Sequence, residues 1–281
     1  LNQIMLLAGM LMSIAGMEMS AVHIRNVKNP KKNYPKAIFI SAIIIILLSV
    51  LVSLAISIVI PDKSLSLSAG VMQAFHYFFK VFNMPWATPI LSFFLAYGVF
   101  TMVITWMVGP SKGLLEVAKE GYLPRTWQKR NKNNMPVGIL YVQGIASTLL
   151  ALAILFMPSV SSAFWLMSAL AAQLYLIMYL FMFAAAIKLR YSHAEVKRDY
   201  QIPGGKTGMW IVAGIAWLAS FFVIIFGFIP PDSVRSDGIM AIIGYIAFLV
   251  VGIAVLLFIP IIFFNVSKRK PSWKISGENN S

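Results

Sequence analysis

The chain of 281 residues is 59% hydrophobic and only 11% charged, with a mean hydropathy of +0.82. Because soluble domains carry about 25% charged residues, this composition excludes a soluble globular protein and predicts an all-α polytopic membrane protein. The lack of any cysteine excludes disulfides, thiolate metal sites and cysteine nucleophiles.

The chain opens on a short apolar segment that ends in a glycine and a carboxylate. Residues 1–15 would extend about 23 Å as a helix, less than the ~30 Å hydrocarbon core of a bilayer. Gly16-Met17-Glu18 follows, and a carboxylate at membrane depth is costly unless it lies in a cavity. Secondary transporters bind substrate at helices broken in this way. We therefore predict a discontinuous helix over residues 1–24, with Glu18 in a functional site.

Six further apolar segments follow in chain order, at residues 37–60, 87–111, 138–157, 162–187, 208–229 and 239–264. The lysines and arginines gather in alternate connections, where 20 of the 23 lie at residues 25–36, 112–137, 188–207 and after 265. This alternation follows the positive-inside rule and predicts a cytoplasmic tail, with Leu1 outside. The net charge of +14 is spread over four connections, which argues against nucleic-acid binding.

An amphipathic stretch at residues 67–82 lies between the second and third segments. One apolar face of this stretch carries Phe75, Phe78, Phe79 and Phe82. Two interpretations remain for it. The helix lies on lipid at the membrane interface, or it covers an extracellular vestibule as a lid.

Segment 87–111 carries a polar stripe on one helical face, formed by Tyr97, Thr101 and Thr105, with Trp106 beside it. Such a stripe faces a water-filled path in one interpretation. In the other, the threonines form hydrogen bonds between helices. The stripe is therefore a candidate polar path.

Segment 162–187 places Tyr175 and Tyr179 one helical turn apart near mid-span. Their hydroxyls need a partner from protein, water or substrate at that depth, although tyrosine is also a common interfacial anchor. Gln173 is a weaker candidate, because glutamine often only bridges helices.

No pattern along the chain predicts an enzyme, a bound metal or a cofactor. His23, His76 and His193 have no metal-ligand partner three or four residues on, and no phosphate-binding glycine loop is present.

Short motifs covering about residues 1–265 resemble those of the amino acid–polyamine–organocation transporters. The motifs that resemble the family at large are Gly16-Met17-Glu18, Val27-Lys28-Asn29-Pro30 and Tyr34-Pro35-Lys36-Ala37. Those that resemble its bacterial glutamate/γ-aminobutyrate antiporter branch are Leu67-Ser68-Ala69-Gly70-Val71-Met72-Gln73, Trp106-Met107-Val108-Gly109-Pro110-Ser111-Lys112-Gly113, Ile202-Pro203-Gly204-Gly205-Lys206 and Pro230-Pro231-Asp232.

The resemblance implies a leucine-transporter-type fold built from two inverted five-helix repeats and two extra helices. On that map, residues 1–190 form the second repeat, 191–265 the two accessory transmembrane helices, and 266–281 a short cytoplasmic tail. The first repeat would be missing from this chain. We therefore expect an N-terminally truncated transporter that needs the missing N-terminal repeat as its partner.

The resemblance also implies roles for single residues. Ala15 and Gly16 would form the unwound backbone near the substrate, and Glu18 would act in gating and pH response. The aromatic residues expected to pack around the substrate are Trp106, Tyr175 and Tyr179. Two departures concern Met12, which stands where relatives have a gating tryptophan, and the short tail, which is too short for the long C-terminal plug of the branch.

The function implied is exchange of glutamate for γ-aminobutyrate across the bacterial inner membrane, in the service of acid resistance. Two alternatives stay open: a permease for another amino acid, and a truncated membrane fragment that does not transport. The expected partners are these amino acids and the lipid bilayer.

Overall fold

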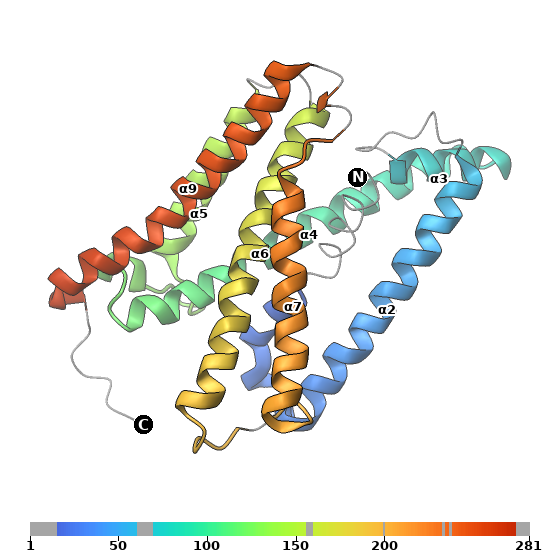
Figure 1. The fold of residues 1–281 in the computed structure, drawn as a ribbon. Coiled ribbons are helices and arrows are strands. Elements are labelled where there is room, and N and C mark those ends of the chain that lie inside the picture. Colours follow the sequence, from blue (N-terminus) through green and yellow to red (C-terminus); the bar gives the residue numbers. More distant parts are fainter. Residues whose placement is uncertain are drawn as a thin grey trace. The chain divides into compact units, whose positions relative to one another are not determined.

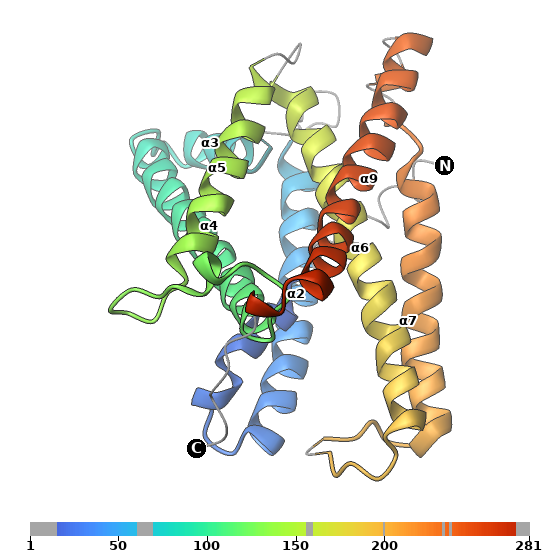
Figure 2. The ribbon, with the colours of Figure 1, turned by 90° about the vertical axis from the view of Figure 1, so that its left-hand side faces the viewer.

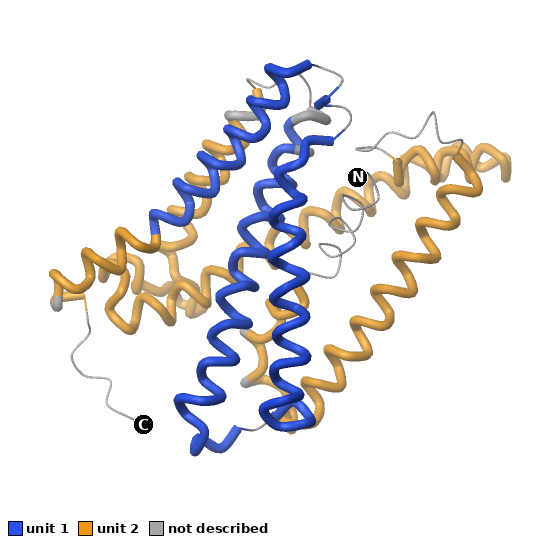
Figure 3. Tube along the Cα trace, viewed as in Figure 1, with its two compact units in different colours: residues 1–15, 158–259 blue, residues 16–157, 260–281 orange. Residues whose placement is uncertain are grey.

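The computed structural model describes residues 16–60, 70–155, 160–198, 200–231, 234–235 and 238–273. Within them every regular element is a helix (Figure 1). The chain forms two compact units: unit 1 comprises residues 1–15 and 158–259, and unit 2 comprises residues 16–157 and 260–281 (Figure 3). None of the limits between these units coincides with the predicted repeat boundary at residue 190. The division into a repeat and two accessory helices stays a prediction.

Unit 2 is built around helix α4. Its elements are the 3₁₀ helix η1 (Met17–Asn26), α2 (Pro30–Val59), α3 (Gly70–Val81), α4 (Ala87–Lys119), the 3₁₀ turn η3 (Arg125–Gln128) and α5 (Val137–Ile154). Helix α4 contacts η1, α3, η3 and α5, while α2 contacts η1 and α3. The predicted break region and the polar stripe therefore belong to the same unit.

Two helices of unit 2 run further than their apolar segments predict. Helix α2 begins at Pro30 rather than at residue 37, because Asn29 adopts a left-handed conformation and proline is well suited to the first helical turn. Helix α4 passes through Pro110 and ends at Lys119 rather than near residue 111. Its added turns bury Leu115 and Ala118, and this packing offsets the hydrogen bond lost at the proline.

The C-terminal end of helix α9 (Ile239–Arg269) is fastened to the α4–α5 connection within unit 2. Phe263 packs against Trp127 with ring centroids 5.3 Å apart. Gln128, the next residue after Trp127, donates a hydrogen bond from Nε2 to Trp273 O at 3.0 Å. Tyr122 stacks on Phe264 at 5.8 Å. We call this aromatic contact the C-terminal clasp.

Unit 1 contains α6 (Val160–Ser192), α7 (Gly205–Gly227) and the first part of α9. Helices α6 and α7 run side by side along most of their length (Figures 1 and 2). A core of Leu170, Tyr245 and Leu249 joins α6 to α9.

Five described helices are long and apolar enough to cross a membrane: Pro30–Val59, Ala87–Lys119, Leu166–Ser192, Gly205–Gly227 and Ile239–Arg269. The predicted segment 138–157 is represented by a shorter apolar helix at Val137–Leu152, and residues 1–15 of the first segment lie outside the described residues. The prediction of an all-α, multi-pass membrane protein is confirmed.

The predicted amphipathic stretch forms helix α3, although residues 67–69 lie outside the described part. Phe75 stacks on Phe79 with ring centroids 6.3 Å apart, whereas Phe82 lies beyond the helix and is exposed. Whether α3 is a lid or an interfacial helix stays a prediction.

Candidate functional site

A left-handed backbone turn lies where the sequence predicts a broken helix. Gly16 has φ +100°, and the 3₁₀ helix η1 starts directly after it. Glycine adopts this conformation freely because it has no Cβ, whereas other L residues pay about 1–2 kcal/mol for it. Ala15 lies just outside the described residues.

Glu18 folds back onto this turn. Its Oε2 accepts a hydrogen bond from the Gly16 backbone N–H at 3.1 Å, and its Oε1 is shielded from solvent. A carboxylate in the first turn of a helix is favoured by the partial positive charge of the free N–H groups. Glu18 therefore stabilises the left-handed turn at Gly16. The sequence did not predict this structural role, and the expected gating role stays a prediction.

Two close contacts seat η1 against α4. A Cβ placed on Gly16 would lie 2.9 Å from Cη2 and Cζ2 of Trp106, and a Cβ on Gly109 would collide with the terminal methyl of Met19. Trp106 and Gly109 share one face of α4, and Gly16 and Met19 lie one 3₁₀ turn apart. The Trp106 side chain thus packs directly on Gly16, and the Met19 side chain packs directly on Gly109. We call this the η1–α4 seat.

The next turn of α4 carries a partly buried polar pair that sequence reasoning missed. Ser111 is fully buried, and its Oγ lies 2.8 Å from Gln143 Oε1 on α5 and 2.6 Å from Met107 O. A signal was available, because Gln143 is a polar side chain within an apolar segment. The pair joins α4 to α5 just below the η1–α4 seat.

The two threonines of the predicted polar stripe satisfy their hydroxyls within helix α4 itself. Thr101 Oγ1 donates to Tyr97 O at 2.8 Å, and Thr105 Oγ1 donates to Thr101 O at 3.0 Å. Tyr97 exposes 61% of its surface. Because backbone carbonyls already accept these hydroxyl hydrogens, the threonines do not require a polar path. The path stays a prediction.

The two candidate tyrosines form a ladder of rings on α6, in unit 1. The Tyr175 and Tyr179 rings meet edge to face with centroids 5.5 Å apart, and Tyr179 continues to Phe183 at 5.9 Å. Both tyrosines are half-buried. The structure thus places Gly16, Glu18 and Trp106 together in unit 2, and the tyrosines together in unit 1.

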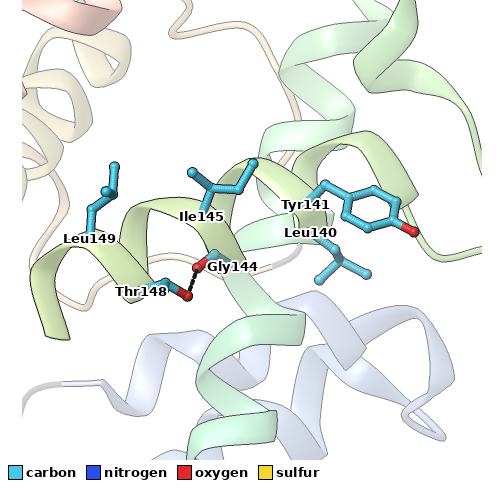
Figure 4. Close-up of a pocket in the computed structure, with 6 residues that line it drawn as sticks. All are labelled: Leu140, Tyr141, Gly144, Ile145, Thr148 and Leu149. Carbon is cyan, nitrogen blue, oxygen red and sulfur yellow. Dashed lines mark hydrogen bonds between the residues drawn. The ribbon is translucent and has the colours of Figure 1, made fainter. Parts of the chain in front are cut away.

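A shallow depression of about 330 Å³ lies on one face of α5 (Figure 4). Its lining residues all belong to that helix: Leu140, Tyr141, Gly144, Ile145, Thr148 and Leu149. Thr148 Oγ1 bonds to Gly144 O at 2.8 Å, so its hydroxyl is already satisfied. A substrate pocket needs several convergent polar groups, whereas small residues on an apolar helix face are typical of helix packing in membranes.

No group of three or more histidine, aspartate or glutamate side chains within the described ranges is arranged to hold a metal ion. The η1–α4 seat presents backbone dipoles, the Glu18 carboxylate and the Trp106 indole ring.

A family profile described as amino acid permease matches residues 3–253. An uncharacterised transporter of Legionella pneumophila is 42% identical over 263 residues, which cover 94% of this chain and 56% of the relative.

Two further relatives are described as glutamate/γ-aminobutyrate antiporters. The protein of Lactococcus lactis subsp. lactis is 36% identical over 230 residues, covering 81% of this chain and 46% of the relative. That of Lactococcus lactis subsp. cremoris is 32% identical over 263 residues, covering 92% and 52%. The chain thus spans about half the length of the curated relatives it matches.

Proposed function

The chain belongs to the amino acid permease family of amino acid–polyamine–organocation transporters, and from this we propose that its residues form half of the substrate site of an amino acid antiporter. The family resemblance drawn from its motifs is confirmed. Its site roles and its leucine-transporter-type second repeat, residues 1–190, remain part of the proposal.

The η1–α4 seat is the observation that carries this function. An amino acid presents a carboxylate and an ammonium group, and a helix break offers backbone N–H groups and carbonyls to both. Gly16 supplies a left-handed turn at the start of η1, Glu18 supplies a carboxylate beside it, and Trp106 closes one side with an aromatic ring. We propose Tyr175 and Tyr179 on α6 as further substrate contacts on the family resemblance alone.

We assign glutamate and γ-aminobutyrate as the exchanged pair, on the strength of the two Lactococcus relatives. Importing glutamate and exporting its decarboxylated product removes one proton equivalent per cycle, which is useful in acid. The transporter would lie in the bacterial inner membrane, with the basic connections and the tail at residues 266–281 on the cytoplasmic side.

Counterflow in proteoliposomes tests the substrate assignment. A chimera in which this chain replaces the matched region of the Lactococcus lactis subsp. lactis antiporter should take up labelled glutamate when loaded with γ-aminobutyrate. The unaltered antiporter is the control. Uptake of a different amino acid in place of both would support the alternative permease, and no uptake of any amino acid would contradict antiport by these residues.

Glu18→Gln in the same chimera should flatten the pH dependence of exchange, because the amide keeps an oxygen that can accept from the Gly16 N–H but no longer binds a proton. We expect the exchange rate of the variant to vary less with pH than that of the parent chimera, measured across the whole range in which the parent responds. The matched control is Glu116→Gln, an exposed carboxylate on α4. An unchanged pH profile would rule out the pH-sensing role.

A further inference from the structure

The C-terminal end of α7 has every one of its last four carbonyls satisfied by a hydrogen bond. Two of the donors are backbone N–H groups of the following turn, from Phe228 to Ile225 O at 3.3 Å and from Ile229 to Phe226 O at 3.0 Å. The other two are side chains of neighbouring helices. Gln173 Nε2 on α6 donates to Ile224 O at 3.1 Å, and Tyr245 Oη on α9 donates to Gly227 O at 3.2 Å. Three helices therefore meet at this end through polar side chains.

Gln173 is buried to 2% exposure and occupies space that only a glycine leaves open. A Cβ on Gly227 would collide with the Gln173 amide group. One turn earlier on α6, Leu170 lies against Gly252 of α9, where a Cβ would come within 3.0 Å of its Cδ1. Two consecutive contact residues of α6 are thus seated at two glycines, one on each neighbouring helix. We call the pair the α6 anchor.

The α6 anchor lies on the side of the helix away from the tyrosine ladder. Tyr175 follows Gln173 by two positions, which corresponds to a rotation of about 200° around a helix. Tyr179 lies within about 40° of Tyr175 on the same face. A rotation of α6 that released Gln173 would therefore turn the tyrosines by the same angle.

We propose that Gln173, seated at Gly227, is a positioning residue that fixes the rotation and axial register of α6 and so the direction in which Tyr175 and Tyr179 point. Only the last turn of α7 has carbonyls free of helical partners, so the Gln173 amide finds an acceptor in one register alone. Its Oε1 is buried without a hydrogen-bond partner among the described residues. A leucine would fill the same space without the cost of a buried, unpaired oxygen, but it would not fix the axial register of α6 against α7. The inference rests on the proposed function only in taking the tyrosines as substrate contacts.

Cysteine labelling tests the proposal on this chain, because the chain has no cysteine of its own. Single reporters are placed by Tyr179→Cys on the ladder face and by Leu176→Cys on a buried position, which is 5% exposed. Maleimide labelling rates are then measured in lipid nanodiscs. With the α6 anchor intact, the ladder-face reporter should react at least about tenfold faster than the buried one.

Gly227→Ala should bring the two labelling rates at least about fivefold closer together, because expelling Gln173 frees α6 to rotate. Gln173→Leu, which keeps the volume and removes the hydrogen bond, should shift the ratio in the same direction. The matched control is Gly244→Ala on α9, where an added Cβ meets no atom within 4 Å. If Gly227→Ala does not fold, Gln173→Leu decides, and an unchanged ratio in that variant overturns the proposal.

Exchange by the chimera separates this inference from the proposed function. If Gln173→Leu raises KM for the amino acid with little change in Vmax, the α6 anchor positions substrate contacts. If the labelling ratio shifts but exchange is unchanged, Gln173 still positions α6, and the substrate role of Tyr175 and Tyr179 is wrong. A loss of melting temperature with an unchanged labelling ratio would reduce Gln173 to a packing residue.

Discussion

Replacing Gly16 with alanine is expected to lower exchange by the chimera at least about tenfold and to destabilise the chain in detergent by about 2 kcal/mol or more. Two penalties act at once. The backbone at φ +100° disfavours any side chain by about 1–2 kcal/mol, and the new Cβ lies 2.9 Å from the Trp106 ring, where overpacking typically costs about 1–3 kcal/mol. Uptake in proteoliposomes and the melting temperature of the purified chain measure the two effects.

Two further variants separate the penalties at Gly16. Gly98→Ala, on the same helix as Trp106, adds a Cβ with no atom within 4 Å and should leave both readouts near their parent values. Adding Trp106→Phe to Gly16→Ala removes the clashing ring atoms but not the backbone strain, so it should restore only part of the melting temperature. Full restoration would show that the left-handed turn carries no strain, and equal losses in Gly98→Ala would show that the η1–α4 seat is not special.

Gly138→Ala is expected to release the C-terminal clasp. Its added Cβ would lie 2.5 Å from Thr126 O and 3.1 Å from the Trp127 Cα, and both are backbone atoms that no rotamer change can move. The connection that holds Trp127 and Gln128 must therefore shift, and we expect a loss of about 1–3 kcal/mol from overpacking. Melting temperature in detergent measures the loss, and hydrogen exchange at residues 125–128 and 271–273 should accelerate.

The control for this prediction lies on the same helix. Gly144→Ala adds a Cβ that meets no atom within 4 Å, and alanine is the better helix former by about 0.5–1 kcal/mol. It should be neutral or mildly stabilising. The prediction would be contradicted if Gly138→Ala were as stable as Gly144→Ala and left hydrogen exchange at residues 271–273 unchanged, because position 138 would then not be coupled to the C-terminal clasp.

Features that depend on local pattern could be predicted from the sequence. The apolar segments and the alternating basic connections indicated a multi-pass helical protein, and the motifs around Gly16 and Trp106 indicated the family. The spacing of Tyr175 and Tyr179 placed their rings together, as the ladder on α6 shows. Each of these inferences needs only neighbouring residues, and helical periodicity supplies the rest.

Features that depend on distant pairing could not be predicted. The apolar segment 87–111 predicts an end to α4 near residue 111, but the burial of Leu115 and Ala118 carries the helix on to Lys119. The sequence favours Gln173 as a bridge between helices, but it holds no sign that the acceptor is Ile224, 51 residues further on. Such partners are set by which helices become neighbours.

The C-terminal clasp places a constraint on biosynthesis. Gln128 binds Trp273, 145 residues later in the chain, and Trp127 and Tyr122 pack against the end of α9. At a synthesis rate of about 5–20 residues per second, these groups wait roughly 7–30 s for their partners to emerge from the ribosome. During that interval an aromatic surface of the α4–α5 connection stays open to chaperones, to lipid and to degradation. Unit 2 is finished only when the last helix has been made.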